Sequence, residues 1–223
     1  MQLLALFDLD NTLIDRQAAL KWWIKDFGAA RGLVPDAELL LWDTLRERAY
    51  PADFDRLRGQ LGLSSSVDAL WGEYVTGMSA RARCFPGLPV ALGRMRADGW
   101  TLGVVTNGAA DIQLAKLESA GLAGLFEGVC TSGEVGARKP ALQVFQVAAE
   151  RCGTTLAKGG WMVGDNPETD VEGGRAAGLR TAWVSAGRQW PAGVRSPDLV
   201  AETASEAIGC LRGQGVTHSS GEA

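Results

Sequence analysis

Short apolar runs and amphipathic helical patterns alternate along most of this chain. Five runs of strand length are almost continuously hydrophobic: LLALFD (3–8), TLGVVT (101–106), FEGVCTS (126–132), WMVGD (161–165) and RTAWVS (180–185). Continuous hydrophobicity over such lengths is typical of strands that are buried on both faces of a parallel sheet. We therefore predict five parallel strands.

Helical patterns separate the last four runs. The sequence predicts helices over 88–98, 109–120, 140–152 and 167–177. Gly99, Gly121 and Gly178 follow three of these segments, at the position where glycine commonly ends a helix. Pro140 stands at a favoured first helical position. The alternation of strands and helices from about residue 86 predicts an α/β fold with a doubly wound, Rossmann-like parallel sheet.

Residues 16–84 contain helical patterns and no run of strand type. The apolar positions from 67 to 78 recur at helical spacing behind the N-cap candidates Ser64, Ser65 and Ser66. We predict an inserted all-helical module over 16–84, within a core of residues 1–15 and 85–212. The final segment, GQGVTHSSGEA (213–223), is rich in glycine and serine, which predicts a flexible tail.

The composition is ordinary for a soluble globular protein. Of 223 residues, 46% are hydrophobic and 22% charged, and the net charge of −4 with scattered basic residues disfavours nucleic acid as a partner. We find no signal-peptide pattern, no apolar run of the roughly 18 residues that a membrane span needs, and no CxxC pair among the four cysteines. These features predict a cytoplasmic protein with reduced thiols and no membrane partner.

Histidine is the most restrictive residue type. The only one is His218, in the predicted tail. A Ser-His-Asp triad, a Cys-His dyad and a histidine-built zinc site are therefore excluded. Any acid–base chemistry has to come from carboxylates, lysines or a metal ion.

Polar residues gather where the predicted strands end, at the edge of the sheet where α/β proteins bind ligands. The candidates are Asp8, Asp10, Thr106, Lys139, Asp165 and Asp170. Each alone is typical of a turn or a helix cap. Together, carboxylates about 4 Å apart repel by roughly 4 kcal/mol at an effective dielectric constant near 20. A metal ion and Lys139 would neutralise them, and ligands with oxygen donors alone favour a hard ion such as Mg²⁺.

Four segments resemble, in order and spacing, the motifs of the haloacid dehalogenase (HAD) superfamily. They are FDLDNTL (7–13), VVTNG (104–108), Lys139-Pro140 and GDNPETD (164–170). The resemblance extends to about residue 212. The helical insert resembles the C1-type cap of subclass I members, with hinges near 14–17 and 79–87.

The resemblance implies phosphoryl transfer through an aspartyl-phosphate. Asp8 would be the nucleophile. Asp10 would protonate the leaving alcohol and later deprotonate the attacking water. The carboxylates of Asp8 and Asp165, with the backbone carbonyl of Asp10, would hold Mg²⁺.

Further roles follow from the same resemblance. Thr106 would donate its hydroxyl to a phosphoryl oxygen, Asn107 would assist through its amide, and Lys139 would bridge the nucleophile and the phosphate. Asp170 and Thr12 are assigned to the outer shell of the metal site.

The resemblance favours a Mg²⁺-dependent phosphomonoester hydrolase of small phosphorylated metabolites. A phosphosugar mutase, a dehalogenase and a non-catalytic binding protein of this fold are the alternatives. A halide leaves without protonation, so the acid at Asp10 favours phosphate esters over a dehalogenase. Substrate contacts could come from tryptophans or cations of the insert, although such residues are more often core or solvated: Trp22, Trp23, Trp42, Trp71, Arg16, Lys21, Arg46, Arg48, Arg56 and Arg58.

Overall fold

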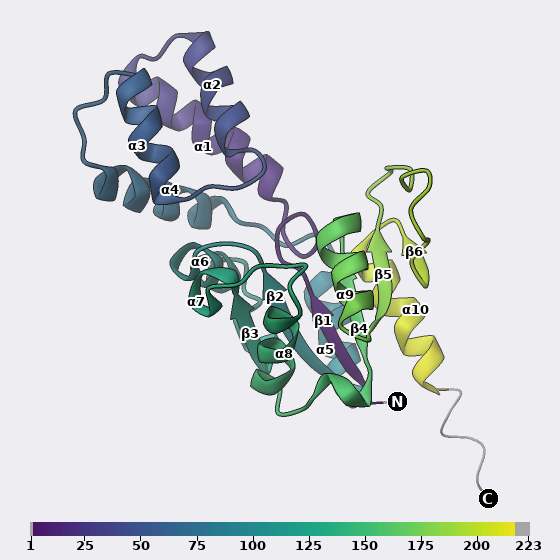
Figure 1. The fold of residues 1–223 in the computed structure, drawn as a ribbon. Coiled ribbons are helices and arrows are strands. Elements are labelled where there is room, and N and C mark those ends of the chain that lie inside the picture. The colour runs from purple at the N-terminus through teal and green to yellow at the C-terminus, as the bar shows by residue number, and fades with distance from the viewer. Residues whose placement is uncertain (1, 217–223) are drawn as a thin grey trace, which may run out of the picture.

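One six-stranded sheet organises the chain in the computed structural model, which describes residues 2–216 (Figure 1). Its strands are Leu4–Phe7 (β1), Thr101–Thr106 (β2), Gly128–Thr131 (β3), Trp161–Gly164 (β4), Arg180–Val184 (β5) and Leu199–Ala201 (β6). All neighbours are parallel, in the order β3-β2-β1-β4-β5-β6. The predicted doubly wound α/β fold is confirmed.

The strand order reverses between β1 and β4, the place where such sheets open a ligand crevice. Phe7 of β1 pairs with Val163 of β4, so the residues that follow these two strands emerge side by side. β6 was not predicted. It is three residues long and lies at the sheet edge with Val200 exposed, so its sequence carries no buried apolar run.

Helices cover both faces of the sheet. Successive β1 residues point to opposite faces, so Ala5 and Phe7 pack in one cluster and Leu4 and Leu6 in another. α5 (Leu88–Ala97) and α10 (Ala204–Val216) pack with the first cluster, and α8 (Leu142–Arg151) packs with the second. The remaining core helices are α6 (Ala110–Ser119), α7 (Ser132–Val135) and α9 (Gly173–Ala176), with short 3₁₀ turns at Ala123–Leu125 and Leu156–Lys158.

Two helix predictions and the start of the predicted tail need correction. The helix expected from Pro140 begins at Leu142, because residues 138–141 form a turn in which Ala141 donates to the carbonyl of Arg138 at 2.8 Å. The segment expected as one helix over 167–177 is a π-helical turn, Pro167–Glu172, followed by α9. α10 runs to Val216, inside the segment 213–223 that was predicted as a tail, and the rest of that segment lies outside the described residues.

Between β1 and α5 the chain forms four helices, which we call the helical insert: α1 (Arg16–Arg31), α2 (Pro35–Leu45), α3 (Pro51–Gln60) and α4 (Val67–Arg81). Ser66 caps α4 by accepting a hydrogen bond from the Ala69 amide at 3.2 Å, as predicted. The apolar stripe of α4 turns inward, with Leu70, Tyr74 and Met78 buried in the core of the insert.

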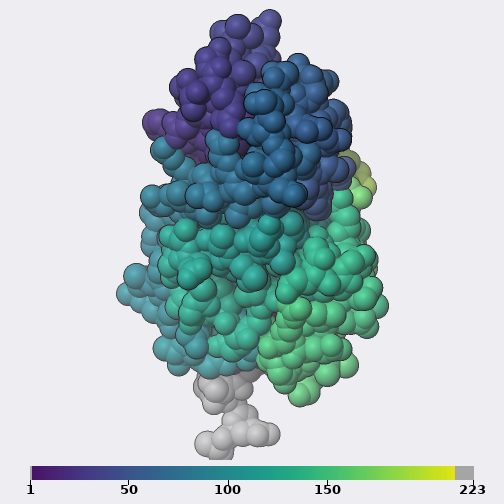
Figure 2. Space-filling model, turned by 90° about the vertical axis from the view of Figure 1, so that its left-hand side faces the viewer, coloured from purple at the N-terminus to yellow at the C-terminus, as the bar shows by residue number. Residues whose placement is uncertain are grey.

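The insert stacks on the rest of the described chain (Figure 2), on the side toward which the strands of the sheet point (Figure 1). Its two linkers run beside each other, because the Asp15 amide donates to Arg83 and the Phe85 amide donates to Leu13, each at 3.1 Å. α4 packs against α6 of the sheet domain, where Trp71 donates to the Asp111 carboxylate at 2.7 Å. These paired linkers fit the predicted insert boundaries near residues 15 and 85, which stay predictions.

Candidate active site

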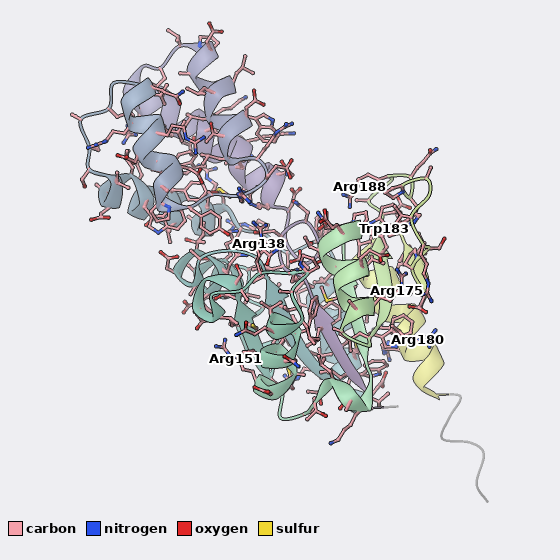
Figure 3. All side chains as sticks on the ribbon, in the orientation of Figure 1. Arg138, Arg151, Arg175, Arg180, Trp183 and Arg188 are labelled. Atoms are coloured by element: carbon pink, nitrogen blue, oxygen red, sulfur yellow. The ribbon has the colours of Figure 1, made fainter. Side chains whose placement is uncertain are left out.

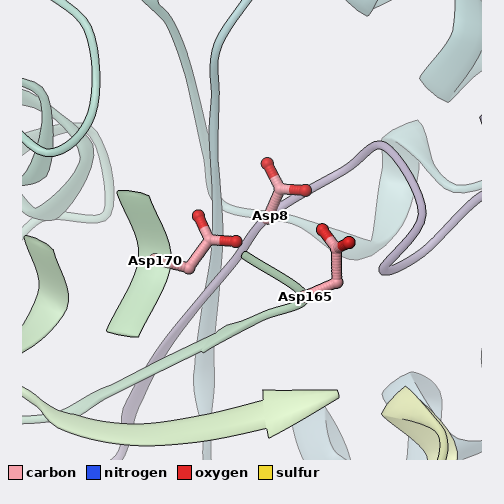
Figure 4. Close-up of side chains that lie close together, drawn as sticks. All are labelled: Asp8, Asp165 and Asp170. Atoms are coloured by element: carbon pink, nitrogen blue, oxygen red, sulfur yellow. The ribbon is translucent and has the colours of Figure 1, made fainter. Parts of the chain in front are cut away.

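Three carboxylates converge at the point where the strand order reverses (Figure 4). Asp8 follows β1, Asp165 follows β4, and Asp170 lies on the π-helical turn. One oxygen of each lies within 4.8 Å of an oxygen of the other two. Gly164 makes this possible, since a Cβ atom at Gly164 would overlap the Asp170 carboxylate. Because Gly164 has no side chain, the buried carboxylate of Asp170 can lie against the backbone at this position.

Lys139 is the cation of this cluster. Its ammonium group donates to Asp8 Oδ1 at 2.6 Å and to Asp170 Oδ1 at 2.7 Å, and its side chain is only 2% exposed. Burial alone would lower the pKa of Lys139, but Asp170 and Asp8 together raise it above its ordinary value. The lysine is therefore a fixed positive charge.

The cluster still lacks positive charge. Burial, opposed by Lys139, raises the pKa of Asp8 to about 8, and burial together with Asp170 raises the pKa of Asp165 to about 6. Arg188 donates to Asp165 Oδ2 at 3.1 Å. Two cations thus face three carboxylates, and an added divalent cation would offset this imbalance.

Asp170 sits behind Lys139 rather than on the cavity wall. Its Oδ1 accepts from Lys139 and its Oδ2 accepts from the Asn166 amide at 3.0 Å. Both oxygens are therefore engaged by protein donors, and the predicted place of Asp170 outside the direct ligands stays a prediction. Thr12 is fully buried, and its hydroxyl has no hydrogen-bond partner among the described residues. Its predicted role stays a prediction.

Thr106 is the last residue of β2, and Asn107, which follows it, contacts Lys139. The Asn107 side chain donates to the Lys139 carbonyl at 3.1 Å and accepts from the Lys139 amide at 2.8 Å, so it holds the lysine backbone. The predicted phosphate contact of Asn107 stays a prediction. Thr106 Oγ accepts from Gln113 Nε2 at 2.6 Å, which leaves its own proton free to donate.

Asp10 lies in a separate set of contacts. Lys116 Nζ donates to both of its carboxylate oxygens at 2.9 Å, Gln113 Nε2 donates at 3.2 Å, and Arg16 Nε lies 3.7 Å away. Burial opposes ionisation here, but Lys116 and then Arg16 outweigh it and lower the pKa of Asp10. The Asp10 carboxyl is therefore ionised at neutral pH, whereas the Asp8 carboxyl is only partly ionised.

A cavity of about 850 Å³ joins these groups to the insert. Asp8, Asp10, Thr106, Lys139 and Asp165 lie on its wall. The wall contributed by the insert carries four of the cations suggested by the sequence: Arg16, Arg46, Arg48 and Arg56. The structure thus brings the predicted site residues and these cations around one space.

The other insert candidates lie elsewhere. Trp22, Trp42 and Lys21 line a separate groove between α1 and α2. Trp23 and Trp71 pack against Tyr74 inside the insert. Arg58 pairs with Asp55 on the surface. Among the described residues, none of the four tryptophans lines the cavity, and the suggestion that they contact the substrate stays a prediction.

Sequence reasoning missed Gln113, Lys116, Arg138 and Arg188. Gln113 and Lys116 are three residues apart on α6, so they share one helical face, and that face also carries the buried Ile112 and Leu117. Polar residues on an apolar helical face are the signal that could have found them.

A family model described as haloacid dehalogenase-like hydrolase matches residues 5–184. This chain belongs to that family. The match runs from the second residue of β1 to the end of β5, and it includes each carboxylate of the cluster and Lys139. The sequence-based resemblance is confirmed.

Phosphatases are among the curated relatives of this HAD-like chain. It is 42% identical over 115 residues to a phosphoserine phosphatase of Thermus thermophilus, covering 52% of this chain and 46% of the relative. A glyceraldehyde 3-phosphate phosphatase of Methanothermobacter thermautotrophicus is 34% identical, covering 80% of this chain and 84% of the relative. This chain spans about half the length of the first curated relatives that it matches.

The solved structures include a 2-haloacid dehalogenase from Pseudomonas syringae. It is 26% identical and superposes with a TM-score of 0.67 over 98% of this chain and 99% of its own. The fold of this HAD-like chain is thus shared by phosphatases and dehalogenases, and the choice between the two activities depends on the site residues. Each helix within residues 2–216 is too short or too polar to span a lipid bilayer.

Proposed function

We propose that this chain is a Mg²⁺-dependent phosphomonoester hydrolase that acts on a small phosphorylated metabolite through an aspartyl-phosphate at Asp8. One observation carries the proposal. Asp8 faces the cavity with Lys139 at 2.6 Å on one side and Asp165 within 4.8 Å on the other, and Asp10 lies on the same wall. A nucleophile, a neutralising cation and a second carboxylate therefore meet at one space.

Each residue has a defined task in this scheme. Asp8 attacks phosphorus while Lys139 and the Thr106 hydroxyl bind the phosphoryl oxygens. As the bond from phosphorus to the ester oxygen breaks, Asp10 gives that oxygen a proton. Asp10 then takes a proton from the water that hydrolyses the aspartyl-phosphate. The negative charge of a bound phosphate raises the pKa of Asp10, which allows the carboxyl to carry the proton for the first step.

Mg²⁺ fits the donors that are present. The carboxylates of Asp8 and Asp165, with the Asp10 carbonyl, offer only oxygen ligands, which hard divalent cations prefer. Burial is the main cause of the raised pKa values of Asp8 and Asp165, and a bound divalent cation would favour the ionised carboxylates that burial opposes. When bound, the ion would shield the Asp8 carboxylate from the charge of the phosphate.

The helical insert is proposed to act as a cap that selects the substrate, over 16–84 and against a core of 1–15 and 85–212. Arg48 of the insert and Arg138 beside Lys139 both line the cavity. Arg138 lies where the insert faces the sheet domain (Figure 3). Cations on both walls favour a small ester that carries a second anionic group, such as a carboxylate. Phosphoserine, for which one relative is named, carries such a carboxylate, whereas glyceraldehyde 3-phosphate, for which another is named, does not.

The test is hydrolysis of p-nitrophenyl phosphate with and without Mg²⁺. Activity is expected only with the metal, and Asp8→Asn is expected to abolish it while the fold survives. Asp55→Asn, which removes an exposed carboxylate outside the cavity, is the matched control. Activity that resists a chelator would contradict the metal assignment, and an unchanged rate in Asp8→Asn would contradict the nucleophile.

The alternatives give different products in parallel assays. A dehalogenase would release chloride from 2-chloropropionate, and a phosphosugar mutase would form an isomer of its substrate without net phosphate release. Asp10 on the cavity wall favours the hydrolase, because halide departure needs no proton donor.

A further inference from the structure

Two buried polar side chains of α6 hold the Asp10 carboxylate. The three protons of the Lys116 ammonium group match three acceptors: the two oxygens of Asp10 at 2.9 Å each and Gln113 Oε1 at 2.7 Å. Gln113 Nε2 donates to Asp10 Oδ2 at 3.2 Å and to Thr106 Oγ at 2.6 Å. Every polar atom of the two α6 side chains is thus engaged.

The sheet domain makes room for this arrangement. A Cβ atom at Gly108 would lie 2.9 Å from Gln113 Cγ and Cδ, so the glycine lets the Gln113 side chain pass under the end of β2. Gln113 is 1% exposed and Lys116 is 2% exposed. Their contacts therefore belong to a close-packed region rather than to a mobile surface.

Stability alone does not account for a lysine at this depth. Removing an ammonium group from water is unfavourable, and a well-packed apolar pair of similar volume is often at least as stable as a buried ion pair. Burial lowers the pKa of Lys116, and the neighbouring Asp10 opposes that change. What the lysine and the glutamine add is a fixed orientation of Asp10 relative to the Thr106 hydroxyl.

We propose that Lys116 and Gln113 are positioning residues that orient Asp10 for proton transfer to the leaving group. The inference rests on the proposed phosphatase activity. Neither residue lies within hydrogen-bond distance of Asp8, whose partner is Lys139. Loss of either α6 residue would therefore leave the nucleophile in place but misalign the carboxylate that serves the ester oxygen.

Leaving groups of different basicity isolate this role. Nitrophenolate departs as a stable anion and needs little protonation, whereas phenolate from phenyl phosphate needs more. General acid catalysis contributes about 10²–10⁴ in rate. We expect Lys116→Met to raise the ratio of kcat/KM for p-nitrophenyl phosphate to that for phenyl phosphate by at least about tenfold. Gln113→Leu should raise the same ratio by a smaller factor, and thermal melts establish that each variant is folded.

Two further variants separate positioning from packing. Lys116→Arg keeps a cation on α6 and should return the ratio toward the wild-type value, while Lys25→Met removes an exposed lysine as the matched control. In an Asp10→Asn background, where single-turnover rates with each ester replace kcat/KM, Lys116→Met should leave the ratio unchanged, because the group that it orients is gone.

Equal losses of activity on both esters in Lys116→Met and Gln113→Leu would overturn the inference. It would also be overturned if Lys116→Met changed the ratio in the Asp10→Asn background as much as it does in the wild-type chain. These results leave the phosphatase proposal standing, because the wild-type chain would still hydrolyse both esters. A wild-type chain that hydrolyses neither ester would instead refute the proposed function, and the positioning role with it.

Discussion

Replacing Lys139 with methionine tests the electrostatic account of the carboxylate cluster. At the observed 2.6 and 2.7 Å, Lys139 attracts each of Asp8 and Asp170 by about 6 kcal/mol at an effective dielectric constant of about 20. Carboxylate oxygens 4.8 Å apart repel by about 3.5 kcal/mol on the same scale. The carboxyls partly avoid this repulsion by becoming protonated. The energies above are therefore upper limits to the loss of stability in Lys139→Met, and they are not summed.

The expected loss is about 3–5 kcal/mol in the free energy of unfolding, the range measured when one partner of a buried ion pair is removed. Urea denaturation in metal-free buffer, followed by tryptophan fluorescence, measures it. Lys158→Met, at an exposed lysine, is the control and should change the free energy by less than about 0.5 kcal/mol.

The double variant gives the sharper result. Adding Asp170→Asn to Lys139→Met removes one of the two carboxylates that have lost their cation, so part of the lost stability should return. A loss below about 1 kcal/mol in the single variant, or a double variant less stable than the single one, would refute the reasoning.

Three other predictions follow from the same contacts. Excess Mg²⁺ should stabilise the chain, by about 2.7 kcal/mol at a hundred times the dissociation constant, and Asp165→Asn should remove that gain in thermal melts. Gly164→Ala should displace the buried carboxylate of the π-helical turn and lower both Tm and activity, whereas Gly72→Ala, which meets open space within α4, should leave both near the wild-type values. Burial raises the pKa of Cys152 to about 11, so at pH 8 its thiol is protonated and the exposed Cys210 should react with a thiol reagent well before it; equal labelling rates would contradict this.

The sheet could be predicted from the sequence because most of its strands are recognisable from their local hydrophobicity. Runs such as TLGVVT are buried on both faces, and their hydrophobicity is unbroken for that reason. The site residues were predictable too, because parallel strands finish at one edge and Asp8 and Asp165 follow adjacent strands. Asp8 and Asp165 are far apart in the sequence, but the pairing of β1 with β4 brings them close together in space.

What the sequence could not provide depends on tertiary contacts. Nothing local says that Lys116 is buried against Asp10, since an isolated lysine on a helix is usually solvated. The helix start at Pro140 was wrong because the Asn107 side chain binds the backbone of Lys139 and residues 138–141 form a turn. The positions of the insert's tryptophans could not be predicted, because helical spacing alone does not distinguish a residue in the core of the insert from one on the cavity wall.

The central claim is that Asp8 carries the phosphoryl group, and the Asp10→Asn variant tests it most directly. With p-nitrophenyl phosphate, this variant should release nitrophenolate in a burst and then stall, because the carboxylate that activates water is missing. Mass spectrometry of the acid-quenched protein should find one phosphoryl group on the peptide that contains Asp8, and none in the Asp8→Asn/Asp10→Asn double variant. A phosphoryl group on another peptide, or steady turnover in the double variant, would contradict the account.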